Sequence, residues 1–211
     1  MTTPGTLATD APSLVPDLIE RRRSIRKLAA GDLPPDAIAA LTAAIERSPA
    51  SMSTTPWRIV LLRDRRAEFW NLVEQAFREH FTGEKLERSL ARLEGFRPAA
   101  LVALVYEDLE VRAFLEAKGM PADTAVDFNL QGLGIVQHAI WITAASLGLG
   151  ASLQHWNAQI EQPLAAFLGL DPARWRLIAQ MPIGVPAETP GPRKPDRDPG
   201  WELDPAPGGI A

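Results

Sequence analysis

The sequence feature that most limits the fold of this chain is a helical pattern from Thr124 to Leu147, the longest in the sequence. Small residues are dense along it, and small residues let neighbouring elements approach the axis of a helix closely. We therefore expect this helix to lie at the centre of the fold, packed on several sides. Its small residues are Gly132, Gly134, Ala139, Ala144 and Ala145.

Shorter patterns on both sides of this helix predict an irregular order of helices and strands. Three apolar runs are typical of buried strands, over residues 57–62, 99–106 and 175–183. Helices are predicted over 14–22, from 34 to before Pro49, and over 65–80, 84–93, 111–117 and 163–168. Because strands and helices do not alternate regularly, we expect an α+β fold with a small central mixed or antiparallel sheet flanked by helices.

The two ends of the chain differ in composition from its middle. Residues 1–13 are rich in Thr, Pro, Gly and Ala, which predicts a flexible N-terminal arm. Residues 14–185 carry all the predicted elements and have the size of a single domain. Residues 186–211 carry much of the proline and cannot form a helix, which predicts an extended arm that lies on a surface through Trp201 and Leu203.

Composition removes several classes of function. The chain has no cysteine, which excludes disulfide frameworks, thiolate metal sites and cysteine nucleophiles, and its three histidines lack the spacing of a zinc site. A net charge of −4 does not favour a nucleic-acid partner. No apolar run reaches the roughly 20 residues that span a membrane, and the N-terminus does not resemble a secretory signal. We therefore expect a cytoplasmic protein with no membrane partner and no bound metal.

Two polar segments far apart in the sequence are candidates for binding a phosphate-bearing cofactor. The segment 21–27 (RRRSIRK) places several cations and a hydroxyl at the end of a helix, and arginine supplies the charge-assisted donors that a phosphate needs. The segment 148–157 (GLGASLQHWN) leaves the long helix through glycines and presents a polar cluster. The simpler interpretations are a solvated basic turn for the first segment and a helix cap leading into a strand for the second.

A third segment, 48–57 (SPASMSTTPW), is a hydroxyl-rich loop that enters the first predicted strand. Its side chains are able to bond a polyol or the edge of a heteroaromatic ring. The commoner use of Ser and Thr in such a loop is to cap turns locally, and the pattern alone does not separate the two.

Taken in order, the three segments resemble those of the nitroreductase family of flavoproteins. That family carries an RRS-x-R segment, a PSS-x-N-x-QPW loop and a GLG turn after its long central helix; here they stand at 22–26, 49–57 and 148–150. The strings GASLQH (150–155) and LIAQMPIG (177–184) are similar to those of the small stress-linked nitroreductases of fungi and bacteria first named for fatty-acid repression. The resemblance runs from about Leu14 to Arg197.

This resemblance implies a homodimer with FMN at the subunit interface and an exchanged C-terminal arm. Arg22, Arg23, Ser24 and Arg26 would hold the phosphate and ribityl chain, joined by Lys194 and Arg197 from the arm. Ser51 and Ser53 would reach the flavin from the other subunit. The ring of the flavin would be lined by Ser152, Leu153, Gln154 and His155.

The resemblance also implies an activity. FMN would take hydride from NADH or NADPH and reduce a nitroaromatic or quinone-like acceptor in a second, separate half-reaction, so that no catalytic side chain is required. His155 is interpreted as a positioning residue or as a group that assists the reduced flavin. The alternative function is an FMN-binding redox sensor or stress-response flavoprotein with little turnover. Ser53 and Thr55 replace the Asn and Gln of the family loop, which we expect to weaken contacts with the flavin rather than abolish binding.

Overall fold

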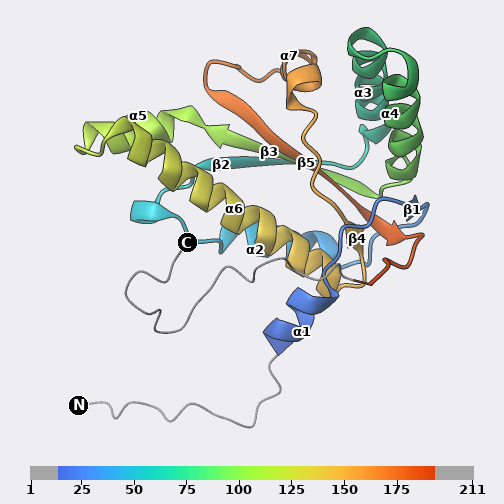
Figure 1. Ribbon diagram of the computed structural model, residues 1–211. Helices are drawn as coiled ribbons and strands as arrows, with labels where there is room; N and C mark the ends of the chain where they lie inside the picture. The colour runs from blue at the N-terminus through green and yellow to red at the C-terminus, as the bar shows by residue number, and fades with distance from the viewer. Residues whose placement is uncertain (1–13, 193–211) are drawn as a thin grey trace, which may run out of the picture.

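The computed structural model describes residues 14–192. The helices are α1 (Leu14–Arg21), α2 (Ala37–Glu46), the 3₁₀ turn η1 (Ser51–Ser53), α3 (Arg66–His80), α4 (Gly83–Phe96), α5 (Leu109–Ala117), α6 (Ala122–Ser146) and α7 (Asn157–Leu168). The strands are β1 (Leu28–Ala29), β2 (Trp57–Leu62), β3 (Leu101–Asp108), β4 (Gly150–Ala151) and β5 (Trp175–Pro186). Figure 1 shows a twisted sheet with helices on both sides, which confirms the α+β prediction.

The sheet runs in the order β1-β5-β3-β2, and β4 pairs with β5 beside this path. All of these strand pairs are antiparallel, so the antiparallel half of the prediction is the right one. Among the described residues, parallel pairing is limited to a single bridge between Ser24 and Ala151. The strand β5 pairs with β1, β3 and β4, so it joins segments that are far apart in the sequence.

The central strand β3 explains how the sheet holds two cores. Every residue of β3 is buried, and side chains along a strand alternate between its faces. Val102, Leu104 and Tyr106 pack in a cluster with residues of α3, α4 and α7. Residues 101, 103 and 105 pack in a second cluster with residues of α2 and α6. A strand buried on both faces reads as a continuous apolar run, which is why 99–106 was recognisable in the sequence.

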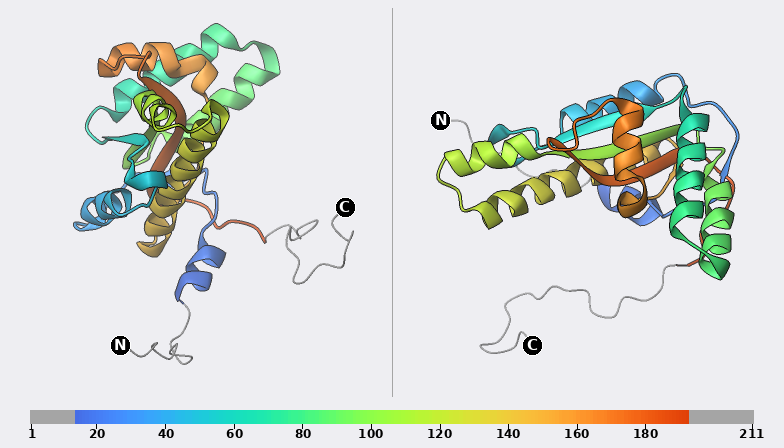
Figure 2. Two further views of the ribbon diagram at one scale, coloured as in Figure 1. Left: turned by 90° about the vertical axis from the view of Figure 1, so that its left-hand side faces the viewer. Right: turned by 90° about the horizontal axis from the view of Figure 1, so that it is seen from above.

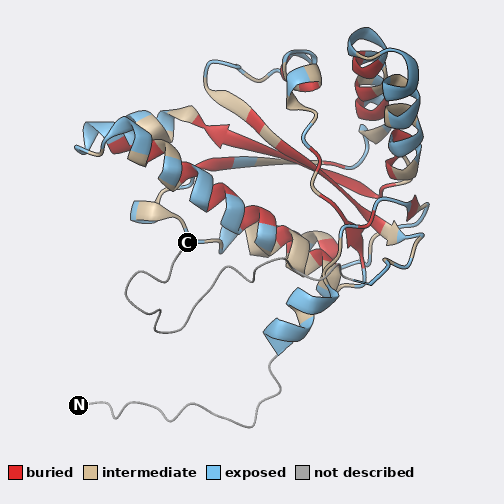
Figure 3. Ribbon diagram, in the orientation of Figure 1, coloured by how far each residue is buried: buried red, intermediate tan, exposed pale blue. Residues whose placement is uncertain are grey.

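The long helix α6 differs from its prediction in one respect. Its inner side is buried against the sheet, but its outer side stays open: Leu130 and Ile135 are 41% and 42% exposed. Figure 3 shows exposed, pale-blue residues along the outer face of the helix. The expectation that α6 is packed on several sides is confirmed by its contacts with α1, α2, α5, β3 and β4, and the difference is that this outer face is left open.

Two further predictions need correction. The helix expected over 163–168 begins six residues earlier, at Asn157, because its buried face, which includes Ile160 and Leu164, extends back past Pro163. The strand expected over 175–183 continues to Pro186, because its last residues pair with Leu28 and Ala29 of β1. Over residues 14–192, no helix combines the length and the apolar character needed to cross a membrane.

Candidate cofactor-binding site

The structure brings the basic segment and the glycine-rich segment side by side. After α1 ends, the chain becomes extended, and Ser24 forms its bridge to Ala151. The Ile25 N–H donates to the Ala151 carbonyl at 3.0 Å. Gly150 makes this approach possible, because a Cβ there would lie 2.8 Å from Ile25 Cγ2. Segments that are more than 120 residues apart in sequence therefore form one surface, as the phosphate-site hypothesis requires.

The basic segment is held from two other directions. Helix α4 packs Gly95 against it so closely that a Cβ on Gly95 would lie 2.5 Å from the Arg26 carbonyl oxygen. On the other side, Glu188 Oε1 accepts hydrogen bonds from the Arg26 and Lys27 N–H groups at 2.6 and 3.2 Å. The Ala187 N–H also donates to the Lys27 carbonyl at 2.9 Å. The backbone of residues 25–27 is thus fixed by neighbours on several sides.

Replacing Gly95 by alanine tests the packing of α4 against the Arg26 backbone. In most helices a Gly-to-Ala change stabilises by up to about 1 kcal/mol. Here the new methyl group would collide with the Arg26 carbonyl, and we expect a loss of about 1–3 kcal/mol in the free energy of unfolding instead. Urea unfolding measures the change. Gly191→Ala is the control, because a Cβ there meets nothing within 4 Å. A more stable Gly95→Ala protein would contradict the packing.

A cavity of about 230 Å³ opens beside the basic segment at the C-terminal end of α6. The Arg22 guanidinium stacks over the Trp141 ring at 4.3 Å, and the Trp141 indole N–H is buried without a hydrogen-bond partner in the described chain. The volume is below the roughly 300–1,000 Å³ of typical small-molecule sites. The cavity in the described chain is therefore smaller than a typical cofactor site. The cavity is lined by Arg21, Arg23, Ile25, Trp141, Ala145, Gly148, Leu149, Gly150, Pro186, Glu188, Thr189 and Pro190.

The segment predicted to line the flavin ring, residues 152–155, follows directly after β4. Its side chains differ in how far they are buried. Ser152 and Gln154 are buried, Leu153 is half-buried and His155 is exposed. The Gln154 side-chain amide donates to Ser152 Oγ at 3.1 Å and to the Leu153 carbonyl at 2.8 Å. Ser152 and Gln154 thus maintain the shape of the segment, whereas Leu153 and His155 reach the surface where a ligand would lie.

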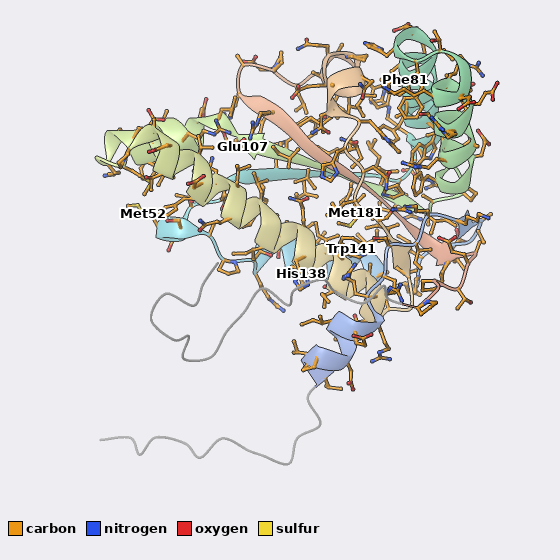
Figure 4. All side chains as sticks on the ribbon, in the orientation of Figure 1. Met52, Phe81, Glu107, His138, Trp141 and Met181 are labelled. Carbon is orange, nitrogen blue, oxygen red and sulfur yellow. The ribbon has the colours of Figure 1, made fainter. Side chains whose placement is uncertain are left out.

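The predicted hydroxyl loop lies elsewhere in the subunit. Its turn η1 contains two non-glycine residues in the left-handed region, Met52 at φ 51° and Ser53 at φ 54°. The loop packs against α6 near Gly132, nine residues before Trp141, which corresponds to about 14 Å along a helix. Figure 4 labels Met52 and Trp141 at these separate places. Ser51 and Ser53 therefore do not join the basic segment within one subunit.

The other predicted cofactor residues differ in exposure, and two of them are not described by the structure. Lys194 and Arg197 lie outside the described residues. Ser24 and Arg26 are exposed, whereas Arg22 and Arg23 are half-buried. Gly95 and Gln180 were given no role from the sequence. Only Gln180 carried a signal, as a lone polar residue in the apolar run of 177–182.

The sequence matches the profile of the Nitroreductase family over residues 19–185. HBN1 of Saccharomyces cerevisiae, which is named as a nitroreductase, is 31% identical over 150 residues, covering 70% of this chain and 72% of the yeast protein. The 5,6-dimethylbenzimidazole synthase of Rhodospirillum rubrum is 27% identical over 179 residues, covering 81% of each chain.

Solved structures agree with the sequence matches. The nitroreductase CinD of Lactococcus lactis, in complex with chloramphenicol, is 27% identical and superposes with a TM-score of 0.78, covering 90% of this chain and 98% of CinD. The family match, over residues 19–185, includes both segments that meet beside Gly150. The chain belongs to the nitroreductase family.

Proposed function

We propose that this chain is an FMN-dependent oxidoreductase that uses NADH or NADPH to reduce a nitroaromatic or quinone-like acceptor in two half-reactions. The observation that carries the proposal is the junction of the basic segment with Gly150–Ala151 in a member of this family. Neighbours with the same fold include a structure described as a nitroreductase in complex with FMN and another in complex with NADPH. Bound FMN supplies the hydride chemistry itself.

The described residues fit a phosphate-bearing flavin. Arg23 lines the cavity and Arg22 stacks on Trp141, which lines it as well. Arginine forms paired hydrogen bonds with phosphate oxygens. Leu153 and His155 are the side chains of the ring segment that reach the surface. The work of the protein is to fix the cofactor and to admit donor and acceptor in turn to its exposed face. His155 is assigned a positioning role.

We further propose that the enzyme is a homodimer with a cofactor site at the subunit interface. Helix α1 has no buried residue, although Leu14, Val15 and Ile19 give it an apolar face. Figures 1 and 2 show it projecting from the body of the subunit. The outer face of α6 and the small cavity are likewise explained by a second copy, which would also bring its Ser51 and Ser53 toward the site.

Ile135→Asp tests the dimer. A carboxylate at the middle of the exposed α6 face would have to be desolvated in the interface, which is costly for an unpaired charge. We expect the variant to sediment as a monomer and to lose FMN affinity together with the dimer. Ala67→Asp on α3, an exposed position on the opposite side of the sheet, is the control. An unchanged sedimentation coefficient for Ile135→Asp would exclude this interface.

The first experiment on function is an absorption spectrum of the purified protein during anaerobic addition of NADH and then NADPH. We expect a flavin spectrum that one nucleotide bleaches and that returns when chloramphenicol or 4-nitrophenol is added, the two nitroaromatic compounds in the CinD complexes. A flavin spectrum that neither nucleotide bleaches would favour a redox sensor with little turnover. A colourless protein that does not take up FMN would refute the proposal.

A second candidate function rests on the Rhodospirillum rubrum relative, whose name is that of a 5,6-dimethylbenzimidazole synthase. That product contains a dimethyl-substituted benzene ring of the kind that FMN also carries, so fragmentation of bound flavin is the corresponding reaction. The same holoprotein, reduced and exposed to air without a nitroaromatic acceptor, is analysed by chromatography. Formation of 5,6-dimethylbenzimidazole would favour this function over nitroreduction.

A further inference from the structure

Gln180 is an unusual residue for its place in the fold. It lies near the middle of β5, between β3 and β4, and its side chain is completely buried. Its neighbours along the strand, from Leu177 to Pro182, are apolar. A buried amide that lacked partners would destabilise the protein, so the bonds that this side chain forms identify its role.

Within the described residues, the hydrogen bonds that Gln180 makes outside its pairing with β3 go to residues 154–157, which overlap and follow the predicted flavin contacts. Its main chain exchanges two bonds with the main chain of Gln154, at 2.8 and 3.0 Å. Its side-chain Oε1 accepts from the Trp156 N–H at 3.0 Å, and its Nε2 donates to Asn157 Oδ1 at 2.7 Å. Of the four residues 154–157, only His155 makes no bond to Gln180 in the described structure.

A β-bulge in β5 provides another attachment between β5 and residues 154–157. Opposite β3, Val105 pairs with Ala179 and Tyr106 pairs with Leu177, so Ile178 is an extra residue in the strand. The Ile178 carbonyl accepts a hydrogen bond from the Asn157 side-chain amide at 2.8 Å. The bulge therefore provides a second anchor for Asn157 beside the one that Gln180 provides.

The side chain of Trp156 adds an apolar anchor. Its ring packs edge-on against Phe77, with ring centroids 5.5 Å apart, and lies 5.9 Å from Phe96. Gln154 on one side and Trp156 on the other are thus both fixed to the core. His155 lies between two fixed neighbours and is exposed, so its backbone direction is set by the bonds of Gln180.

We infer that Gln180 is a positioning residue, which holds Leu153 and His155 in the orientation that receives the isoalloxazine ring. This inference rests on the proposed function, since it presumes that the ring lies on this segment. Gln180 acts through its neighbours, because it is buried beneath them. Breaking its side-chain bonds should change how the flavin is held, beyond any general loss of stability.

The test compares Gln180→Met with Gln137→Met in the full-length protein reconstituted with FMN. Methionine keeps the approximate shape of glutamine and removes its hydrogen bonds. Gln137 is also buried, but its amide donates to Leu133 of its own helix at 2.8 Å. We expect Gln180→Met to raise the Kd for FMN about tenfold, the effect of losing a buried hydrogen bond. We also expect its bound-flavin absorption bands and midpoint potential to move toward those of free FMN. Gln137→Met should retain the wild-type spectrum and potential.

The results for the two variants distinguish a positioning role of Gln180 from a contribution to stability alone. Wild-type Kd, spectrum and potential in Gln180→Met would overturn it, and so would equal changes in both variants, because they would indicate only a loss of stability. If Gln180→Met does not fold, Asn157→Ala replaces it, since this half-buried residue loses the bonds to Gln180 and Ile178. Wild-type protein that does not bind FMN would refute the proposed function as well, which separates the two failures.

Discussion

Replacing both Arg22 and Arg23 by alanine is expected to raise the Kd for FMN by about a hundredfold or more. Each guanidinium lost from a phosphate removes a charge-assisted interaction of roughly 1.5–3 kcal/mol, and two such losses multiply the Kd by at least two orders of magnitude. Arg23 lines the cavity beside Gly150, and Arg22 stacks on Trp141 at the same cavity. The loss should therefore appear as a colourless protein at FMN concentrations that saturate the wild type.

Riboflavin separates this prediction from a general effect on the fold. It carries the same ring and ribityl chain as FMN without the phosphate, so its Kd should change only slightly in the double variant. Arg88→Ala removes an exposed arginine of α4 that pairs with Glu84, and it should leave both affinities unchanged. Equal losses of FMN and riboflavin affinity would show that Arg22 and Arg23 do not act on the phosphate.

Much of the fold was predictable because its strands form short apolar runs, of which β3 is buried on both faces, and because several helices have periodic apolar residues. The strand at 57–62 has the predicted bounds, and the helix predicted from Thr124 begins two residues earlier. The two-residue strands β1 and β4 were not predictable, since their conformation is set by pairing with β5 rather than by any local pattern. The predicted start of α7 at Pro163 was wrong. Proline is most common in the first turn of a helix, but here it lies inside the helix.

The candidate site was predictable to a similar degree. The resemblance indicated that the basic segment and the residues after Gly148 serve one cofactor, and the structure brings them together at Ala151. Sequence spacing did not reveal the contacts that hold these two segments in place. These contacts are the close approach of Gly95 to the basic segment and the hydrogen bonds of Gln180. Both depend on contacts between residues that are far apart in the chain. Nothing in a linear pattern distinguishes a supporting glycine from an ordinary helix glycine.

The largest expected effect on stability comes from Glu107, at the other end of the sheet. This carboxylate is completely buried, and it accepts hydrogen bonds from Arg112, Arg176 and Asn129. Figure 4 labels it near the start of α6. Asp108, the next residue, caps α5 and pairs with Arg174, whose pKa it raises by accepting a hydrogen bond from it. The cluster joins the end of β3 to α5, α6 and the start of β5.

Glu107→Gln is expected to reduce the free energy of unfolding by about 3 kcal/mol, because removing one partner of a buried ion pair leaves the other charges uncompensated. Part of that cost is relieved by solvent, since the Arg176 side chain is 42% exposed. Glu74 is a matched control: Arg78 and Arg97 bond to it as well, and the hydrogen bond from Arg78 is the main cause of its lowered pKa.

Solvent reaches Glu74, so the loss in Glu74→Gln should be several-fold smaller. Urea unfolding of both variants measures the difference, and FMN titration of the folded proteins should give wild-type affinity in each. Equal losses of stability would mean that the burial of Glu107 does not govern its contribution. A loss of FMN affinity in Glu107→Gln would instead connect this cluster, through β5, to the segment that Gln180 holds.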